Sequence, residues 1–135
     1  MRFMTMVRAA ENQGAPPEAL MHAIAKGSEE SARAGTLIDT GGLAPSAIGT
    51  RVRVSGGKLS VTDGPFAEAK EVVGGYAVLQ VNSKEEAIEW LKRAPFDETE
   101  VEIRQVFEAD DFGAEFTPEL REQEARLLAQ VAAKK

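Results

Sequence analysis

The chain has 135 residues and a mass of 14.5 kDa, enough for one domain with a single hydrophobic core. Its 22 acidic and 16 basic residues give a formal net charge of −6, which argues against direct nucleic-acid binding through phosphate neutralisation. The absence of cysteine excludes disulfides, thiolate nucleophiles and cysteine-ligated metals, and the single histidine, His22, excludes a multi-histidine metal site within one chain.

The hydropathy of the chain carries no sign of a membrane segment. The N-terminal run MRFMTMVRAA lacks the apolar stretch of a signal peptide, and no run approaches the roughly 20 apolar residues of a membrane-spanning helix. We therefore expect a cytoplasmic protein without membrane association, and the composition predicts neither a metal ion nor a cofactor.

The first 43 residues predict a strand, a helix and a second strand. Residues 2–8 alternate Phe, Thr and Val with methionine, so both faces are apolar, which is typical of a covered central strand. Residues 15–35 carry apolar side chains at helical spacing, with two prolines at the start and Gly35 at the end. The run TLIDTGGL, residues 36–43, is short and β-branched and predicts a strand.

A hairpin is the strongest local signal in the middle of the chain. Residues 50–62, TRVRVSGGKLSVT, alternate apolar and polar side chains on either side of Gly56 and Gly57. Residues 74–81, GGYAVLQV, predict a third main strand.

The remaining elements are marked by their caps. Residues 82–95 predict a helix, because Ser83 is a suitable N-cap and Glu86 lies three residues later, as in a capping box. Residues 99–108 predict a fourth main strand. Thr117 and the following proline predict the start of a last helix over residues 117–135.

The element order predicts an α+β fold of the ferredoxin-like class. Two βαβ units joined by a β-hairpin give a four-stranded antiparallel sheet with both helices on one face. We expect this domain to span residues 1–116, with residues 117–135 as a C-terminal helical extension.

One face of such a sheet has no helix to cover it, although its strands are apolar. The residues that make these strands too apolar for a solvated face are Met4, Met6, Tyr76, Val78 and Val106. Because an uncovered apolar sheet is usually an interface, we expect a homodimer that packs sheet against sheet.

The segment VTDGPFAEAKE, residues 61–71, has an unusual composition for a simple connection. Asp63 can accept hydrogen bonds from nearby backbone N–H groups in an Asx-turn, while Gly64 and Pro65 shape a stiff loop and Phe66 is free to pack on apolar surface. Such a loop serves either as a structural corner or as a rigid support that presents Asp63 as a catalytic base or ligand-binding group.

The segments VTDGPFAEAKE, GGYAVLQV, SKEEAIEWLKRAP and VEIRQVFE together resemble the YCII-related family, and specifically its DGPF-domain branch. The resemblance runs from Met1 to about Phe116. It implies a dimeric α/β barrel built on a ferredoxin-like fold, with no established general activity. Some relatives lie beside or are fused to extracytoplasmic-function sigma factors, and a few others act in small-molecule degradation.

The resemblance also bears on His22 and Asp39. Some family members outside this branch pair a histidine on the first helix with an aspartate after the second strand, in an arrangement like an acid–base dyad. Here the matching helix position lies nearer Ile24, so we interpret His22 as a surface histidine. Asp39 lies near the position of the family's aspartate and is a candidate ligand-binding residue.

Three further side chains are candidate ligand-binding groups. Arg104 projects from one face of the last strand, where it could bind a carboxylate bidentately or form an ion pair with Glu102, Glu68 or Asp63. Tyr76, the only tyrosine, offers a hydroxyl in the same region but also suits a core. Phe66 is the aromatic candidate of the DGPF loop.

Three functions remain open on this basis. The first is a small-molecule-binding or regulatory domain, linked to a sigma-factor or stress circuit. The second is an enzyme, lyase-like or isomerase-like, that acts on a small organic acid with Asp63 as base and Arg104 as anion anchor. The third is an assembly protein, based on the apolar seam of the last helix. The seam residues are Leu120, Leu127, Leu128 and Val131.

Overall fold

The structure is a computed structural model that describes residues 1–10, 15–66 and 71–134. It divides into two compact units, Met1–Gln105 and Val106–Lys135, and each is described by itself. The first unit contains β1 (Arg2–Ala10), α1 (Glu18–Arg33), β2 (Leu37–Gly42), the short 3-10 helix η1 (Ser46–Ile48), β3 (Thr50–Ser55), β4 (Lys58–Asp63), β5 (Glu71–Gln80), α2 (Lys84–Lys92) and β6 (Val101–Gln105). The second contains a 3-10 helix, η2 (Ala109–Asp111), and α3 (Pro118–Ala133).

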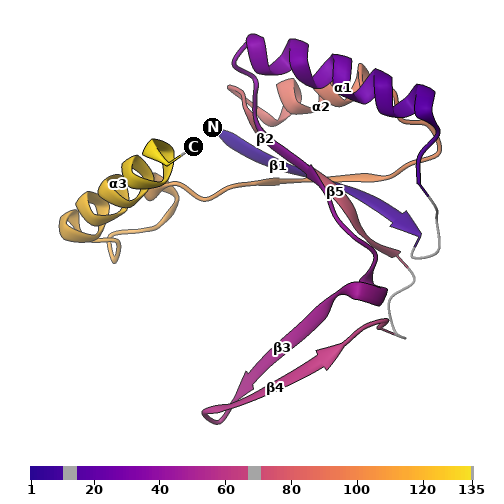
Figure 1. Cartoon of the computed structure of the whole chain (residues 1–135). Helices are drawn as coiled ribbons and strands as arrows, with labels where there is room; N and C mark the ends of the chain where they lie inside the picture. Colours follow the sequence, from indigo (N-terminus) through magenta and orange to yellow (C-terminus); the bar gives the residue numbers. More distant parts are fainter. Residues whose placement is uncertain (11–14, 67–70, 135) are drawn as a thin grey trace. The chain divides into compact units, whose positions relative to one another are not determined.

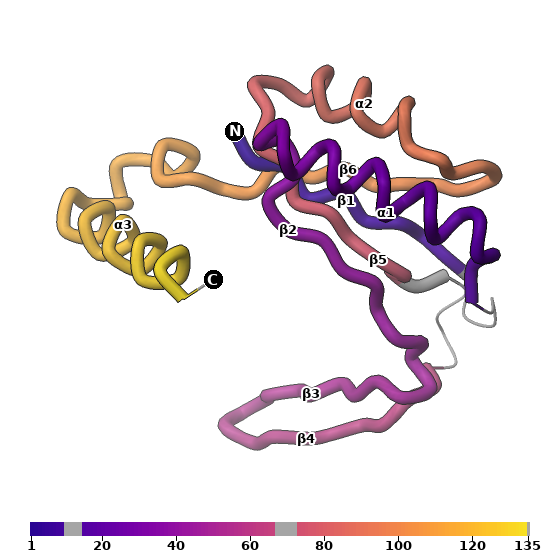
Figure 2. The backbone as a smooth tube through the Cα atoms, turned by 45° about the horizontal axis from the view of Figure 1, so that its top comes forward, coloured from indigo at the N-terminus to yellow at the C-terminus, as the bar shows by residue number. Residues whose placement is uncertain are grey.

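The first unit is built on a four-stranded antiparallel sheet with the strand order β2-β5-β1-β6. Helices α1 and α2 lie side by side on one face of this sheet (Figures 1 and 2). The sequence-based prediction of a mixed α+β fold with an antiparallel sheet and a C-terminal helix is therefore confirmed. Among the described helices, none has the length and apolar character needed to cross a membrane.

The hydrophobic core lies between the sheet and the two helices. It is formed by Phe3 on β1, Ala77 and Leu79 on β5, Val81 after β5 and Ala87 on α2, and Leu37, Trp90 and Ile103 pack against it. Thr5 is buried in the same layer. Its hydroxyl donates a hydrogen bond of 3.2 Å to the carbonyl oxygen of Ala77, which satisfies its polar group.

The helix ends follow the capping chemistry expected from the sequence. Gly35, with φ of +79°, follows the C-cap of α1, in the left-handed conformation that glycine adopts without strain. The Ser83 hydroxyl accepts a hydrogen bond from the backbone N–H of Glu86 at the start of α2. The Thr117 hydroxyl does the same for Leu120 at the start of α3, and these predicted caps are confirmed.

The predicted hairpin is present as a separate two-stranded sheet, β3–β4. Gly56 and Gly57 have φ of +58° and +77°, the positive values that a tight hairpin turn of this type requires. Strand β6 is shorter than the predicted range 99–108, because it pairs with β1 only from Val7 to Phe3, close to the beginning of β1.

The second unit has an aromatic cluster before its helix. Phe112 packs against Phe107 and Phe116, with ring centroids 5.4 and 5.0 Å apart, and Arg121 of α3 forms an ion pair of 2.8 Å with Asp110. The predicted apolar seam of α3 remains exposed. Its members are Leu120, Leu127, Leu128 and Val131.

Candidate functional site

Pairing between strands determines which side chains share the face of the sheet opposite α1 and α2, called the outer face below. Residues directly opposite each other in an antiparallel sheet point to the same face. Because Phe3, Ala77 and Leu79 point towards the helices, their neighbours along each strand point away from them. The outer face is thus defined by the register of four strands.

Two rows of residues cross the outer face from the β2 edge to the β6 edge. The first row is Asp39, Val78, Met4 and Arg104, and the second is Gly41, Tyr76, Met6 and Glu102. Both rows have apolar or aromatic side chains on the two central strands. Their charged groups lie on the edge strands, so the face has an apolar centre between an acidic β2 edge and a mixed β6 edge.

Charges gather at the β6 edge. The carboxylate of Glu102 lies 3.9 Å from the guanidinium of Arg8 and 3.9 Å from that of Arg104. Both distances are at the outer limit of an ion pair. Arg104 is also exposed over 74% of its side chain, so its interaction with Glu102 is weak. Because Arg104 is so exposed, the donors of its guanidinium remain open to solvent at this edge.

Tyr76 extends across the outer face towards the β2 edge. A Cβ atom placed on Gly41 would lie 3.0 Å from the ring and 3.2 Å from the hydroxyl oxygen of Tyr76, so the ring rests over this glycine. The two residues are directly paired across β2 and β5. The absence of a side chain at position 41 therefore provides the space that the Tyr76 ring occupies.

Asp39 is exposed at the β2 edge and held in place locally. Its Oδ1 accepts a hydrogen bond of 2.8 Å from the backbone N–H of Thr40, and the Thr40 hydroxyl donates to the carbonyl oxygen of Tyr76 at 2.9 Å. Within the chain, Asp39 and Tyr76 thus lie towards one edge of the outer face and Arg104 lies at the other edge. The three candidates share a face but do not form one cluster.

Asp63 lies at the end of β4, outside the four-stranded sheet. Its Oδ1 accepts a hydrogen bond of 3.0 Å from the hydroxyl of Thr50, the residue opposite it in the hairpin. The backbone N–H of Gly64 donates to Gly49, and a Cβ atom on Gly64 would overlap the carbonyl oxygen of Ser46. Asp63 and Gly64 thus close the base of the hairpin, and the proximity of Asp63 to Arg104 remains a prediction.

Phe66 is half-buried, and its contact with apolar surface remains a prediction. The guanidinium of Arg51 lies over its ring, 3.9 Å from the centroid, which is the geometry of a cation–π interaction. Residues 67–70, which include the predicted ion-pair candidate Glu68, lie outside the described part of the chain.

His22 has the position expected of a surface histidine. Its Nε2 lies 3.3 Å from the carboxylate of Glu18, one helical turn earlier, and both side chains are largely exposed to solvent. Nothing in this geometry connects His22 with Asp39, which lies on the sheet.

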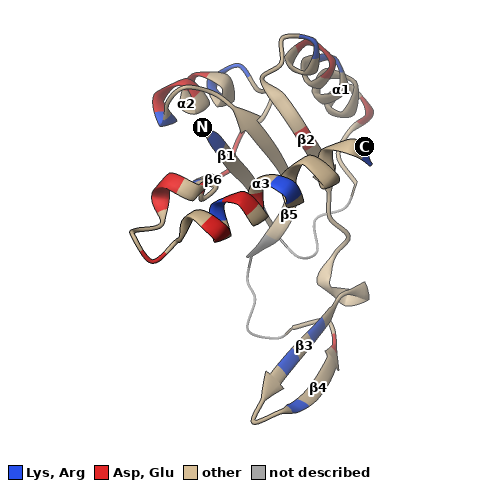
Figure 3. Ribbon diagram, turned by 90° about the vertical axis from the view of Figure 1, so that its left-hand side faces the viewer, with Lys and Arg blue, Asp and Glu red and all other residues tan. Residues whose placement is uncertain are grey.

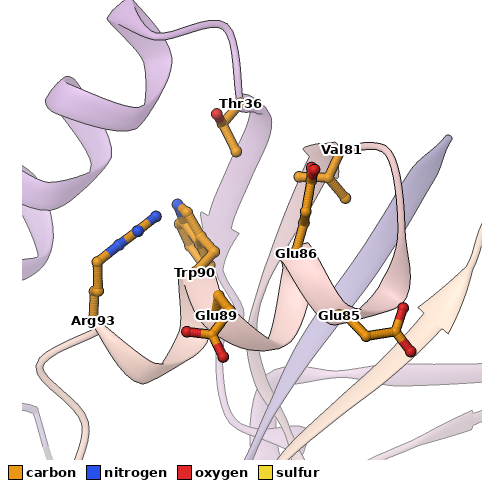
Figure 4. A pocket seen from close by; sticks show the side chains of 7 residues that line it. All are labelled: Thr36, Val81, Glu85, Glu86, Glu89, Trp90 and Arg93. Carbon is orange, nitrogen blue, oxygen red and sulfur yellow. The ribbon is translucent and has the colours of Figure 1, made fainter.

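A groove of about 320 Å³ runs along α2 (Figure 4). Its lining residues are Thr36, Val81, Glu85, Glu86, Glu89, Trp90 and Arg93. Several of these polar groups already have structural partners. The indole N–H of Trp90 donates to the Ser31 hydroxyl at 2.8 Å, and Glu86 accepts from the backbone N–H of Asn82 at 2.9 Å. The hydrogen bond from Lys92 lowers the pKa of Glu89. We interpret the groove as part of the packing interface between α1 and α2.

Comparison with family models decides the relationship of the chain to known proteins. Residues 1–110 match the model of the YCII-related domain. The chain belongs to the YCII-related family. The match covers the sheet, both of its helices and the hairpin, and it ends before α3 begins. A search of curated proteins finds no match.

The sequence did not reveal the cluster at the β6 edge of this YCII-related domain. Arg8 was missed, although it follows Met4 and Met6 at the same alternating spacing. That spacing was the available signal, because side chains at alternate positions of a strand share a face. Among the described residues, no group of three or more acidic or histidine side chains is arranged to hold a metal ion.

Proposed function

We propose that this YCII-related protein is a homodimeric small-molecule-binding protein whose sites form between two outer faces. The observation that carries the proposal is the layout of the two rows: apolar residues in the centre, Asp39 and Tyr76 towards one edge, and Arg104 at the other. The finer description of the fold as ferredoxin-like, and of the assembly as a dimeric α/β barrel, belongs to this proposal.

The proposed symmetry follows from this layout. A two-fold axis parallel to the strands places the β2 edge of one copy over the β6 edge of the other. Because Asp39 and Arg104 belong to the same row, Asp39 then faces Arg104 of the partner subunit. The apolar centres, with Met4, Met6 and Val78, cover each other, as the inner faces of stacked sheets do. Each dimer has two equivalent mixed-charge positions.

Such a composite site suits a small organic acid that carries a second polar group. The guanidinium of Arg104 binds a carboxylate with two parallel hydrogen bonds, and its high exposure within one protomer leaves its donors accessible. The hydroxyl of Tyr76 and the carboxylate of Asp39, supplied by the partner subunit, recognise a hydroxyl or amine on the ligand. The site is incomplete without the second copy.

Binding is favoured over turnover by the position of Asp63. The residue predicted as the base of the enzyme hypothesis accepts a hydrogen bond from Thr50 at the base of the hairpin, where it has a clear structural role. We therefore propose a binding or regulatory protein. The DGPF branch, and with it a role in a sigma-factor or stress circuit, is part of the same proposal and rests on the resemblance of residues 61–71.

The function is tested with small acids as probes and the single tyrosine as reporter. We expect glycolate and glycine, added to the dimer, to shift the NMR signals of the Tyr76 ring in a saturable manner, and acetate to act more weakly. Arg104→Gln should weaken binding about tenfold or more, equivalent to about 1.4 kcal/mol. Arg93→Gln, which changes an arginine of the α2 groove, is the matched control. Equal binding by both variants would contradict the proposed site.

A further inference from the structure

The β3–β4 hairpin has two unlike faces, and all twelve residues of its two strands are exposed. One face carries four aliphatic side chains that remain 58–70% exposed. These are Val52, Val54, Leu59 and Val61, paired directly across the two strands. The other face carries three basic residues together with serine and threonine hydroxyls. The basic residues are Arg51, Arg53 and Lys58.

We expect an exposed aliphatic face of this kind to pack against other protein surface. A two-stranded hairpin alone is at best marginally stable in water, because one ribbon cannot bury its own side chains. Figure 1 shows the hairpin extending away from the four-stranded sheet within the first unit. The aliphatic residues form two cross-strand pairs, Val52 with Val61 and Val54 with Leu59, so the exposed apolar surface is continuous.

The charge of the hairpin indicates which partner packs on its aliphatic face. Residues 50–63 contain three basic side chains and one acidic side chain, a net charge of +2 in a chain whose net charge is −6. The rest of the chain therefore has a net charge of −8. Figure 3 shows the basic residues of β3 and β4. The net positive charge of the ribbon attracts it at long range to the acidic body of an identical copy, while its basic side chains lie on the face that stays in solvent. Two hairpins, in contrast, repel each other.

We propose that the β3–β4 hairpin is a dimerisation arm whose aliphatic face packs on the body of a second copy of this chain. The proposal rests on the dimer proposed above and adds a contact to it. Four partly exposed aliphatic side chains supply on the order of 250 Å² of apolar surface. A stable interface takes about 800 Å² from each partner, so the arm extends the contact between the outer faces and does not replace it.

The absence of cysteine from the chain allows a direct test. Leu59→Cys and Ser60→Cys place one thiol each on adjacent residues of β4 that point to opposite faces. The reaction rate with N-ethylmaleimide is measured over a range of protein concentrations, with sedimentation of the same samples. We expect the thiol at position 59 to react about tenfold more slowly in the dimer, and the thiol at position 60 to change less than about twofold.

A second pair of variants tests the contact without a label. The double variant Val54→Thr with Leu59→Thr keeps β-branched or compact side chains in the strands and removes apolar surface. It should raise the dimer dissociation constant about tenfold, whereas Ser60→Thr on the opposite face should leave it unchanged.

The outcomes separate this proposal from the one on which it rests. A dimer in which both thiols react at their monomer rates would contradict the proposed dimerisation arm but not the proposed contact between the outer faces. Protection of position 59 that does not depend on concentration would place the cover within the same chain and also overturn the arm. A protein that is monomeric at all concentrations would contradict both proposals.

Discussion

The two faces of the four-stranded sheet are made by the same strands and differ in almost every respect. On the helix side, Phe3 and Leu79 are buried at 3% and 0% exposure, and Thr5 has its hydroxyl satisfied by Ala77. On the outer face, Met4 and Val78 are only half-buried. The comparison indicates that the helix-side face contains the hydrophobic core of the unit, whereas the outer face leaves apolar and charged side chains partly exposed.

The two faces should differ most in the loss of unfolding free energy caused by Leu79→Ala on the helix side and Val78→Ala on the outer face. Leu79 is fully buried, so its truncation should lower the free energy of unfolding by about 2–5 kcal/mol through lost burial and the cavity it leaves. Val78→Ala should cost less within one protomer, because that side chain is half-buried. Urea denaturation of both variants under monomeric conditions measures the contrast. Equal losses of unfolding free energy in the two variants would contradict the assignment of the core to the helix side of the sheet.

A smaller effect is expected from Thr5→Val, which alters polarity on the helix side at nearly constant volume. The variant removes the hydroxyl that donates to the Ala77 carbonyl oxygen, and the expected loss is about 0.5–1.5 kcal/mol. The control is Thr40→Val, which removes the exposed hydroxyl that donates to the carbonyl oxygen of Tyr76. The free energy of unfolding of both variants is measured by urea denaturation. A larger loss for the exposed threonine would contradict the assignment of the core to the helix side.

The smallest effect on stability should come from Gly41→Ala, on the outer face. The new methyl group would lie about 3.0 Å from the Tyr76 ring, whose outer end can move aside, so the stability change should stay below about 1 kcal/mol. The ring signals of Tyr76 should nevertheless shift clearly in NMR spectra. Unchanged Tyr76 signals would show that the ring does not rest over this glycine.

Local chemistry explains how much of the fold could be predicted. The turn at Gly56–Gly57 and the caps at Ser83 and Thr117 were recognisable because each depends on a few neighbouring residues. The alternation of Met4 and Met6 also indicated the apolar outer face. These features require no knowledge of which strands pair.

The rows of the candidate site could not be predicted, because they depend on register. The pairing of β2 with β5 shifts between Leu37 and Asp39, and that of β1 with β5 shifts between Val7 and Arg8. A slip of one residue would move a side chain to the opposite face, so no local pattern places Asp39 beside Val78. Asp63 and Phe66 were singled out by composition, yet the contacts described for them serve the hairpin.

Charge reversal across the proposed dimer tests the central claim most directly. Sedimentation equilibrium is measured for the wild type, Asp39→Arg, Arg104→Asp and the double variant that exchanges the two charges. If Asp39 faces Arg104 of the partner subunit, each single variant should weaken the dimer about tenfold or more, and the double variant should recover most of the affinity. Single variants that dimerise like the wild type, or a double variant with the summed loss of both, would contradict the account.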